Sequence, residues 1–293
     1  MSIETVAILS PGEMGAAVGK AFVDNGFSVI TTLEGRSEPT RERALASGFQ
    51  DEGSLADVIA AADIVLSILP PATAPAQAEA VAAAMRKTGK TPPYADCNAI
   101  APDTTIRIGQ IIADTGANYI DGGIIGNPPG KSKPTRFYVS GPGATAMNVF
   151  DDKGIVVHQC GPVVGRGSAV KMVYAGITKG TSALHAAMLI AAERLEVADE
   201  LHGELQSGQS AIYERMERMT PALPAVSDRY IGEMLEIAKT MASCDMPPGF
   251  HEGAADLYGL LDKSPFSSER RDTVDKSRTL RRTIEVCATS GTE

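Results

Sequence analysis

The sequence predicts an α/β domain with a mostly parallel sheet, followed by an all-helical domain. Short apolar runs alternate with Ala-rich amphipathic segments in the first half, and strand-like runs stop after residue 164. Strands that alternate with helices imply right-handed crossovers and a parallel sheet. A length of 293 residues also exceeds that of most single domains. We therefore expect one domain at residues 1–164 and a second at 165–293.

Seven apolar runs are expected to be strands, at residues 5–10, 27–33, 62–70, 94–98, 117–126, 136–141 and 154–160. Between them, helical spacing predicts helices at 15–26, 74–89 and 103–116. A long helix is expected over 167–197, with a bend near Gly176 or Gly180, because this run lacks proline and keeps helical spacing. Further helices are expected at 210–220, 226–243 and 251–263.

Composition excludes several classes of partner. The formal net charge is −9 and no dense Lys/Arg block occurs, so neither nucleic acid nor an anionic membrane is expected as a partner. No apolar run is long enough to span a bilayer, and no signal peptide is evident. The four cysteines are widely spaced, which favours buried free thiols, no metal site and a cytoplasmic location.

The stretch that follows the first predicted strand resembles a dinucleotide-binding loop. The expected cofactor-binding residues there are Ser10, Pro11, Gly12, Glu13 and Met14. This strand-to-helix turn would direct backbone N–H groups and the positive end of the helix dipole at a pyrophosphate. Ser10 stands where the usual G-x-G-x-x-G pattern has its first glycine. The domain is therefore expected to be of the Rossmann type.

The end of the second strand bears on the choice of cofactor. An acidic residue there would accept the ribose hydroxyls of NAD, whereas an arginine would pair with the 2′-phosphate of NADP. The sequence offers both, because Glu34 stands two residues before Arg36. Arg36 and Ser37 suit a phosphate, so we expect NADP, with NAD as the open alternative. Leu69 and Pro70, which end another strand, are expected to shape the cofactor shelf.

Four blocks in order resemble the β-hydroxyacid dehydrogenase family, whose members include 6-phosphogluconate and 3-hydroxyisobutyrate dehydrogenases. The blocks are PGEMG after the first strand, DCNAIAP at 96–102, DGGIIGNPPG at 121–130 and GRGSAVKMVYA at 165–175. The likeness covers about residues 3 to 200. The "LEGRS" insertion and the C-terminal part resemble a little-characterised branch of this family, distinct from the named enzymes.

The resemblance implies roles for individual residues. Lys171 would be the catalytic general acid/base that exchanges a proton with the substrate hydroxyl. Asn98 would contact the nicotinamide ribose and bind substrate, and the backbone around Ala99, Gly122 and Gly123 would receive the acid group of the substrate. A plain turn at the two glycines is the alternative to a binding role.

The family usually has an asparagine four residues after its catalytic lysine, where this chain has Ala175. Tyr174 and Thr178 follow Lys171 at three and seven residues, on one face of an α-helix, and would bind substrate in its place or else pack in the core. His251 would close the active site, or else serve as a surface or capping residue.

The function implied is an NADP-preferring oxidoreductase that transfers hydride between nicotinamide and the hydroxyl-bearing carbon of a small 3-hydroxy acid. Two alternatives stay open, an imine reductase on the same fold and a non-catalytic dinucleotide-binding sensor. A homodimer through the helical domain is expected, because residues 183–195 are apolar on nearly every side and the family dimerises there.

Overall fold

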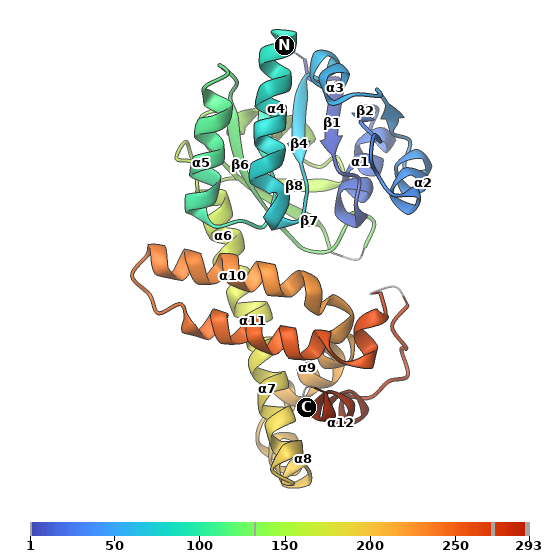
Figure 1. Cartoon of the computed structure of the whole chain (residues 1–293), viewed down its shortest axis with the longest axis vertical. Coiled ribbons are helices and arrows are strands. Elements are labelled where there is room, and N and C mark those ends of the chain that lie inside the picture. The colour runs from blue at the N-terminus through green and yellow to red at the C-terminus, as the bar shows by residue number, and fades with distance from the viewer. Residues whose placement is uncertain (1, 132, 271–272, 291–293) are drawn as a thin grey trace. The chain divides into compact units, whose positions relative to one another are not determined.

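The computed structural model describes residues 2–131, 133–270 and 273–290, and the chain forms two compact units, 1–172 and 173–293 (Figure 1). The expected division after residue 164 lies just before helix α6 (Arg166–Ala175), whereas the two units of the structure divide within this helix.

The first unit is built on an eight-stranded sheet of order β3-β2-β1-β4-β5-β6-β7-β8. All strand pairs are parallel except β6 with β7. The strands are β1 (Thr5–Leu9), β2 (Ser28–Thr31), β3 (Gln50–Asp51), β4 (Ile64–Ser67), β5 (Tyr94–Asp96), β6 (Tyr119–Ile125), β7 (Thr135–Ser140) and β8 (Ile155–Gln159). The first six strands follow the order of doubly wound dinucleotide-binding sheets, so the predicted fold class is confirmed.

Helices cover both faces of this sheet because its strands are apolar on both sides. Along β1, Val6 and Ile8 belong to the core under α1 and α2, whereas Ala7 and Leu9 belong to the core under α3, α4 and α5 (Figure 1). The helices of this unit are α1 (Glu13–Asp24), α2 (Glu38–Ala46), α3 (Leu55–Ala61), η1 (Pro71–Thr73), α4 (Ala74–Thr88), α5 (Pro102–Ala113) and η2 (Ala144–Phe150).

The second unit is helical throughout its described residues, as predicted. The expected long helix is interrupted by a π-helical turn, η3 (Gly176–Gly180), at the two glycines where a bend was expected. The other elements are α7 (Thr181–Arg194), α8 (Ala198–Gly208), α9 (Ser210–Met219), η4 (Thr220–Ala222), η5 (Pro224–Val226), α10 (Ser227–Ser243), α11 (Gly249–Asp262), η6 (Pro265–Ser268) and α12 (Leu280–Thr289).

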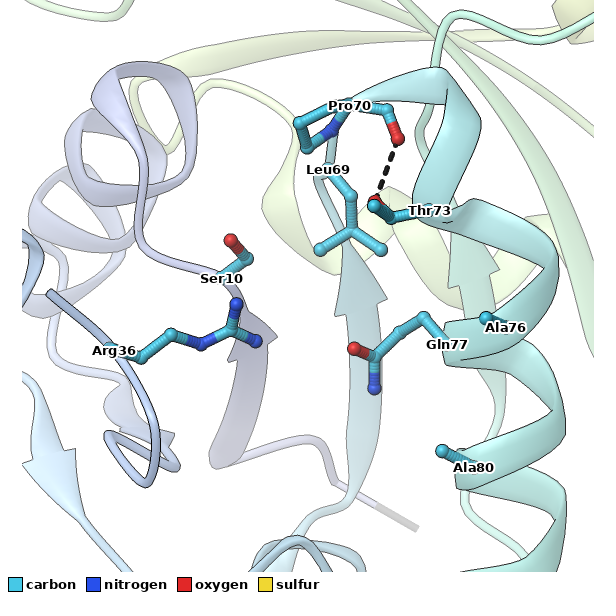
Figure 2. A pocket seen from close by; sticks show the side chains of 8 residues that line it. All are labelled: Ser10, Arg36, Leu69, Pro70, Thr73, Ala76, Gln77 and Ala80. Carbon is cyan, nitrogen blue, oxygen red and sulfur yellow. Dashed lines mark hydrogen bonds between the residues drawn. The ribbon is translucent and has the colours of Figure 1, made fainter.

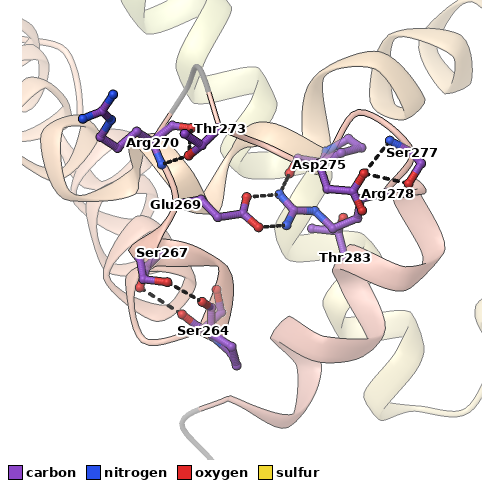
Figure 3. A network of polar contacts seen from close by, with 12 residues as sticks. Ser264, Ser267, Glu269, Arg270, Thr273, Asp275, Ser277, Arg278 and Thr283 are labelled. Carbon is purple, nitrogen blue, oxygen red and sulfur yellow. Dashed lines mark hydrogen bonds and ion pairs between the residues drawn. The ribbon is translucent and has the colours of Figure 1, made fainter.

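An ion pair between the buried Arg278 and the partly buried Glu269 secures the last segment of this unit. Arg278 faces the Glu269 carboxylate in Figure 3, and its two terminal nitrogens donate to Glu269 at 2.7 and 2.9 Å. The same guanidinium donates to the carbonyl of Pro221 at 2.6 Å and lies 4.0 Å from the ring centroid of Phe266. Arg278 therefore joins η4, η6 and the chain that leads into α12.

The four cysteines are free, as expected, but they are not all buried. Cys97 and Cys287 are buried, Cys160 is partly buried and Cys244 is exposed. Cys244 follows the last residue of α10, where the helix ends at the surface. No helix within the described ranges is both long and apolar enough to cross a membrane.

Candidate cofactor and substrate site

The loop between β1 and α1 forms the turn that the sequence predicts. Ser10 has a φ of +64°, the left-handed conformation for which glycine is favoured. Its carbonyl accepts the Gly12 N–H at 2.7 Å, which closes the turn before α1 begins at Glu13. Gly12 caps α1 without a side-chain hydrogen bond, so the first N–H groups of the helix face outward at its positive end.

The two loop glycines differ in what lies beside them. A β-carbon at Gly12 would meet only the Ser10 carbonyl, at 4.0 Å, so the space over this residue is open. A β-carbon at Gly15 would lie 3.0 Å from the Ser10 carbonyl and 3.4 Å from the Ile8 side chain. Gly12 thus leaves room for a phosphate, and Gly15 allows α1 to pack against the strand.

A pocket of about 430 Å³ opens beside this loop (Figure 2). It brings together four predicted cofactor-binding residues, Ser10, Arg36, Leu69 and Pro70. The remaining lining residues come from the end of η1 and the first half of α4 and were not predicted: Thr73, Ala76, Gln77 and Ala80. Their spacing of three and four residues marks one helix face. That spacing was the available signal, but it occurs equally on faces exposed to solvent.

Arg36 places a cation on the pocket wall. Its Nε is buried and has no hydrogen-bond partner among the described residues, and its guanidinium points into the pocket in Figure 2. A buried donor of this kind favours an anionic ligand, since leaving it unsatisfied costs free energy. Glu34 is exposed and does not line the pocket, and the Ser37 hydroxyl pairs with that of Thr40 at 3.0 Å.

Asn98 holds in place the segment that carries Leu69 and Pro70 at the edge of the pocket. Its Oδ1 accepts the Leu69 N–H at 2.5 Å, and its Nδ2 donates to the Ser67 hydroxyl at 3.0 Å. These bonds tie the end of β5 to the end of β4. Asn98 is 2% exposed, whereas its neighbour Ala99 is partly exposed. Asn98 therefore positions Leu69, and its contact with a nicotinamide ribose stays a prediction.

Asp96, at the end of β5, is a buried carboxyl group with one unsatisfied oxygen. Its Oδ1 accepts the Asn98 N–H at 3.0 Å, while its Oδ2 has no partner within the described ranges. Burial raises the pKa of Asp96 to about 7, and the nearby carboxylate of Asp121 adds to the rise. Asp96 therefore titrates near neutral pH, one residue from the buried Cys97 thiol.

Asp121 anchors the start of α6 to strand β6. Its carboxylate accepts five donors: the Thr105 hydroxyl at 3.2 Å, the Ser140 hydroxyl at 2.8 Å, the Gly165 N–H at 3.0 Å, and the Ser168 N–H and hydroxyl at 3.1 and 2.5 Å. A carboxylate at a helix N-terminus is also favoured by the helix dipole. The sequence did not single out Asp121, because its donors come from three distant segments.

Gly122 and Gly123 lie in the middle of β6, within the strand expected at residues 117–126, so the plain turn given as the alternative for the two glycines is wrong. A β-carbon at Gly122 would come within 2.9 Å of the Cys97 sulfur. A β-carbon at Gly123 would lie 2.5 Å from the Gly167 carbonyl and 2.7 Å from Cβ of Lys171. Both glycines are therefore explained by packing, and backbone contact with an acid group stays a prediction.

Lys171, the predicted catalytic residue, lies in α6 and is partly buried. Two contacts hold this helix against β6. The Asp121 carboxylate accepts hydrogen bonds from the start of the helix, and Gly123 packs against Gly167 and Lys171. The position of its backbone is therefore set by buried contacts within the first unit.

The other predicted substrate residues lie in the helical unit. Tyr174 is 47% exposed, and the Thr178 hydroxyl donates to the Tyr174 carbonyl at 3.0 Å. Thr178 was expected to share a face with Lys171, but the π-helical turn changes the angular step there, so that spacing argument fails. His251 packs its Nε2 beside Gly176 and Gly180, and its buried Nδ1 has no partner among the described residues.

Comparison with known proteins agrees with this geometry. Residues 5–160 match the NAD-binding domain of 6-phosphogluconate dehydrogenase, and residues 192–261 match a domain of unknown function, DUF1932. An uncharacterized 28.5 kDa protein of Methanothermus fervidus is 27% identical over 83% of this chain and 93% of its own length.

Two solved structures share the fold. The conserved protein MTH1747, described as structurally similar to 3-hydroxyacid dehydrogenases, is 26% identical with a TM-score of 0.66, over 88% of this chain and 96% of its own. The 3-hydroxyisobutyrate dehydrogenase of Salmonella typhimurium is 17% identical with a TM-score of 0.68, over 92% and 98% of the two chains.

The fold and the loop beside its pocket define the class as NAD(P)-dependent oxidoreductases. Within this class, the chain belongs to the β-hydroxyacid dehydrogenase-like family that carries the NAD-binding domain of 6-phosphogluconate dehydrogenase.

Proposed function

We propose that this protein is an NADP-preferring oxidoreductase that acts on the hydroxyl-bearing carbon of a small 3-hydroxy acid, with Lys171 as general acid/base. The observation that carries the proposal is the pocket between the phosphate loop and α4, whose wall holds the Arg36 Nε, an atom with no hydrogen-bond partner in the described part of the chain. The phosphate loop would bind a pyrophosphate, and Arg36 would bind a second anionic group. Together they favour a ligand that contains both.

The residues present fit the cofactor. The open space over Gly12 and the outward N–H groups of Glu13 and Met14 would hold the pyrophosphate, with Ser10 and Pro11 shaping the turn. Arg36 would pair with the 2′-phosphate, and Ser37 would add a hydroxyl if it released Thr40. Leu69 and Pro70 would support the cofactor from below. When bound, the nicotinamide donates or accepts the hydride.

Lys171 would exchange a proton with the oxygen of the reacting carbon. Asp121 and Gly123 support this role because they fix the segment of α6 that carries the lysine. Asn98 would hold the shelf beside the nicotinamide ribose, and the partly exposed backbone at Ala99 would be open to the acid group. Tyr174, Thr178 and His251 would complete the substrate site.

We also propose a homodimer through the helical unit. Four apolar side chains between η3 and the end of α7 are exposed in a single chain: Ile177 at 71%, Leu184 at 51%, Met188 at 53% and Leu195 at 72%. Exposed apolar side chains gathered on one segment favour burial against a second copy. Light scattering on the wild type should give the mass of two chains, and Met188→Glu should lower it. A stable single-chain mass for the wild type at micromolar concentration would contradict the dimer.

A turnover assay tests the proposed reaction. Wild type, Lys171→Met and the surface control Lys87→Ala would each be incubated with 3-hydroxy acids and NADP⁺ or NAD⁺, and with cyclic imines and NADPH or NADH. We expect wild type and the control to oxidise at least one hydroxy acid with NADP, and Lys171→Met to lose at least a hundredfold in kcat. Turnover of imines alone would favour an imine reductase. Cofactor binding without any Lys171-dependent turnover would favour a sensor.

A further inference from the structure

One wall of the pocket is a flat, apolar face of helix α4. Ala76 and Ala80 lie one turn apart on this face and present only methyl groups, with Thr73 before them. The opposite face of the helix, including Ala78, Val81 and Met85, is buried in the core of the first unit. The position of the pocket wall is therefore fixed by core packing.

The other wall carries a planar cation. The guanidinium of Arg36 faces α4 across the pocket in Figure 2. A guanidinium stacks favourably on an aromatic ring, and a row of methyl groups packs against the opposite side of such a ring. The space between the two walls therefore suits a flat heterocycle. Ser10 of the phosphate loop also lines the pocket, so the slot is next to the expected phosphate site. A heterocycle bound in the slot would therefore belong to a ligand that also carries phosphate.

Gln77 contributes a neutral carboxamide to this slot. Its NH₂ group is a hydrogen-bond donor and its carbonyl oxygen is an acceptor, and both lie in one plane. It is partly buried, points from α4 into the pocket, and makes no hydrogen bond to any of the other lining residues drawn in Figure 2. A carboxamide presents its acceptor and its donor side by side. Adenine offers the matching pair, a donor at N6 and an acceptor at N7, whereas hypoxanthine offers two acceptors along the same edge.

We propose that Gln77 reads the adenine base of the cofactor and discriminates against purines with an oxygen at position 6. This inference rests on the proposed dinucleotide cofactor and adds to it a determinant of base specificity. The Oε1 atom of Gln77 accepts from the N6 amino group and its Nε2 atom donates to N7. In a purine with an oxygen at position 6, the Gln77 Oε1 would face another acceptor, O6. One of the two hydrogen bonds is then lost.

The test compares NADPH with its deaminated analogue, which carries hypoxanthine in place of adenine. Dissociation constants would be measured by fluorescence titration for wild type, Gln77→Met and Gln110→Met. The last is a matched control on α5, exposed and outside the pocket. Wild type and the control should bind NADPH about tenfold more tightly than the analogue. In Gln77→Met this ratio should fall to about one.

The other outcomes separate this inference from the proposed function. If Gln77→Met binds NADPH and keeps the wild-type ratio, Gln77 does not read the base, and the proposed function stands. If Gln77→Met instead changes the preference for NADP over NAD, Gln77 contacts the 2′-phosphate and the inference is wrong. If wild type binds neither NADPH nor NADH, the proposed function itself fails.

Discussion

Gly123 of β6 and Lys171 of α6 are in direct contact, because a β-carbon on Gly123 would fall 2.7 Å from Cβ of Lys171. The same β-carbon would approach the Gly167 carbonyl to 2.5 Å, and a backbone atom cannot turn away as a flexible side chain can. The strand and the helix that carries the proposed catalytic residue are therefore held at a separation that only glycine allows.

Gly123→Ala should push α6 away from β6. We expect a loss of about 1 to 3 kcal/mol in the free energy of unfolding, because the added methyl overpacks a buried contact. The shift of Lys171 should also lower kcat by at least tenfold. Urea denaturation and steady-state kinetics would measure the two effects.

A matched control is Gly232→Ala in α10, where a β-carbon would meet nothing within 4 Å. That substitution should leave stability unchanged or raise it by up to about 1 kcal/mol, since alanine is the better helix former. Equal stability of Gly123→Ala and wild type would show that the contact at β6 is not tight.

Asp121→Asn should weaken the attachment of α6 to β6. The carboxylate accepts five donors, and an amide would turn its own NH₂ toward some of them. We expect a loss of about 3 kcal/mol in the free energy of unfolding, because buried donors are left unsatisfied. Urea denaturation measures the loss. A change under about 0.5 kcal/mol would mean that water or rearranged hydroxyl groups replace the carboxylate.

Asp96→Asn should change how stability depends on pH. The pKa of Asp96 is about 7 in the folded chain and near 3.8 when exposed, so the folded state binds more protons between these values. The free energy of unfolding of the wild type therefore contains a contribution that falls as pH rises from about 4 to about 7. An asparagine cannot ionise, so the variant lacks this contribution.

Relative to wild type, the variant should gain up to about 4 kcal/mol in stability between about pH 4 and about pH 8. Urea denaturation of both proteins across this range measures the difference, in which the titrating groups that do not interact with Asp96 cancel. A constant difference between the two proteins would show that Asp96 does not carry its proton into the neutral range.

Arg278→Met should destabilise the helical unit. The substitution keeps the length of the apolar stem but leaves the Glu269 carboxylate and the Pro221 carbonyl without their donor. Removing the cation leaves a partly buried carboxylate and a carbonyl oxygen unsatisfied, which costs about 1 to 3 kcal/mol. Thermal unfolding would report a lower Tm. Arg282→Met, at an exposed neighbour, is the control and should have little effect.

The alternation of strands and helices was predictable because apolar runs and helical spacing are local signals. Helices α2 and α3 and strand β3 were not predicted. In α2 only Ala44 is buried, and β3 has two exposed residues, so neither leaves a hydrophobic pattern in the sequence. Helix α8 was missed for the same reason, since it buries only His202. Helix α12 was also missed, although it buries Leu280, Ile284 and Cys287 at helical spacing.

The pocket was predicted as far as it is formed by strand ends and the phosphate loop. Ser10, Arg36, Leu69 and Pro70 follow strands whose carboxyl ends meet at one edge of the sheet. Gln77 was not predicted, because nothing local in an Ala-rich helix distinguishes a pocket face from a solvent face. Asp121 was not predicted either, because its donors come together only through the tertiary fold.

The central claim is that this pocket holds NADP through Arg36, and calorimetric titration of NADP⁺ and NAD⁺ into wild type and Arg36→Ala tests it most directly. Loss of one charge-assisted contact to the 2′-phosphate should weaken NADP⁺ binding about tenfold or more and leave NAD⁺ binding nearly unchanged. Arg86→Ala, at an exposed residue in the last turn of α4 and outside the pocket lining, is the control and should bind both cofactors as wild type does. Equal weakening of both cofactors in Arg36→Ala, or no weakening of either, would contradict the claim.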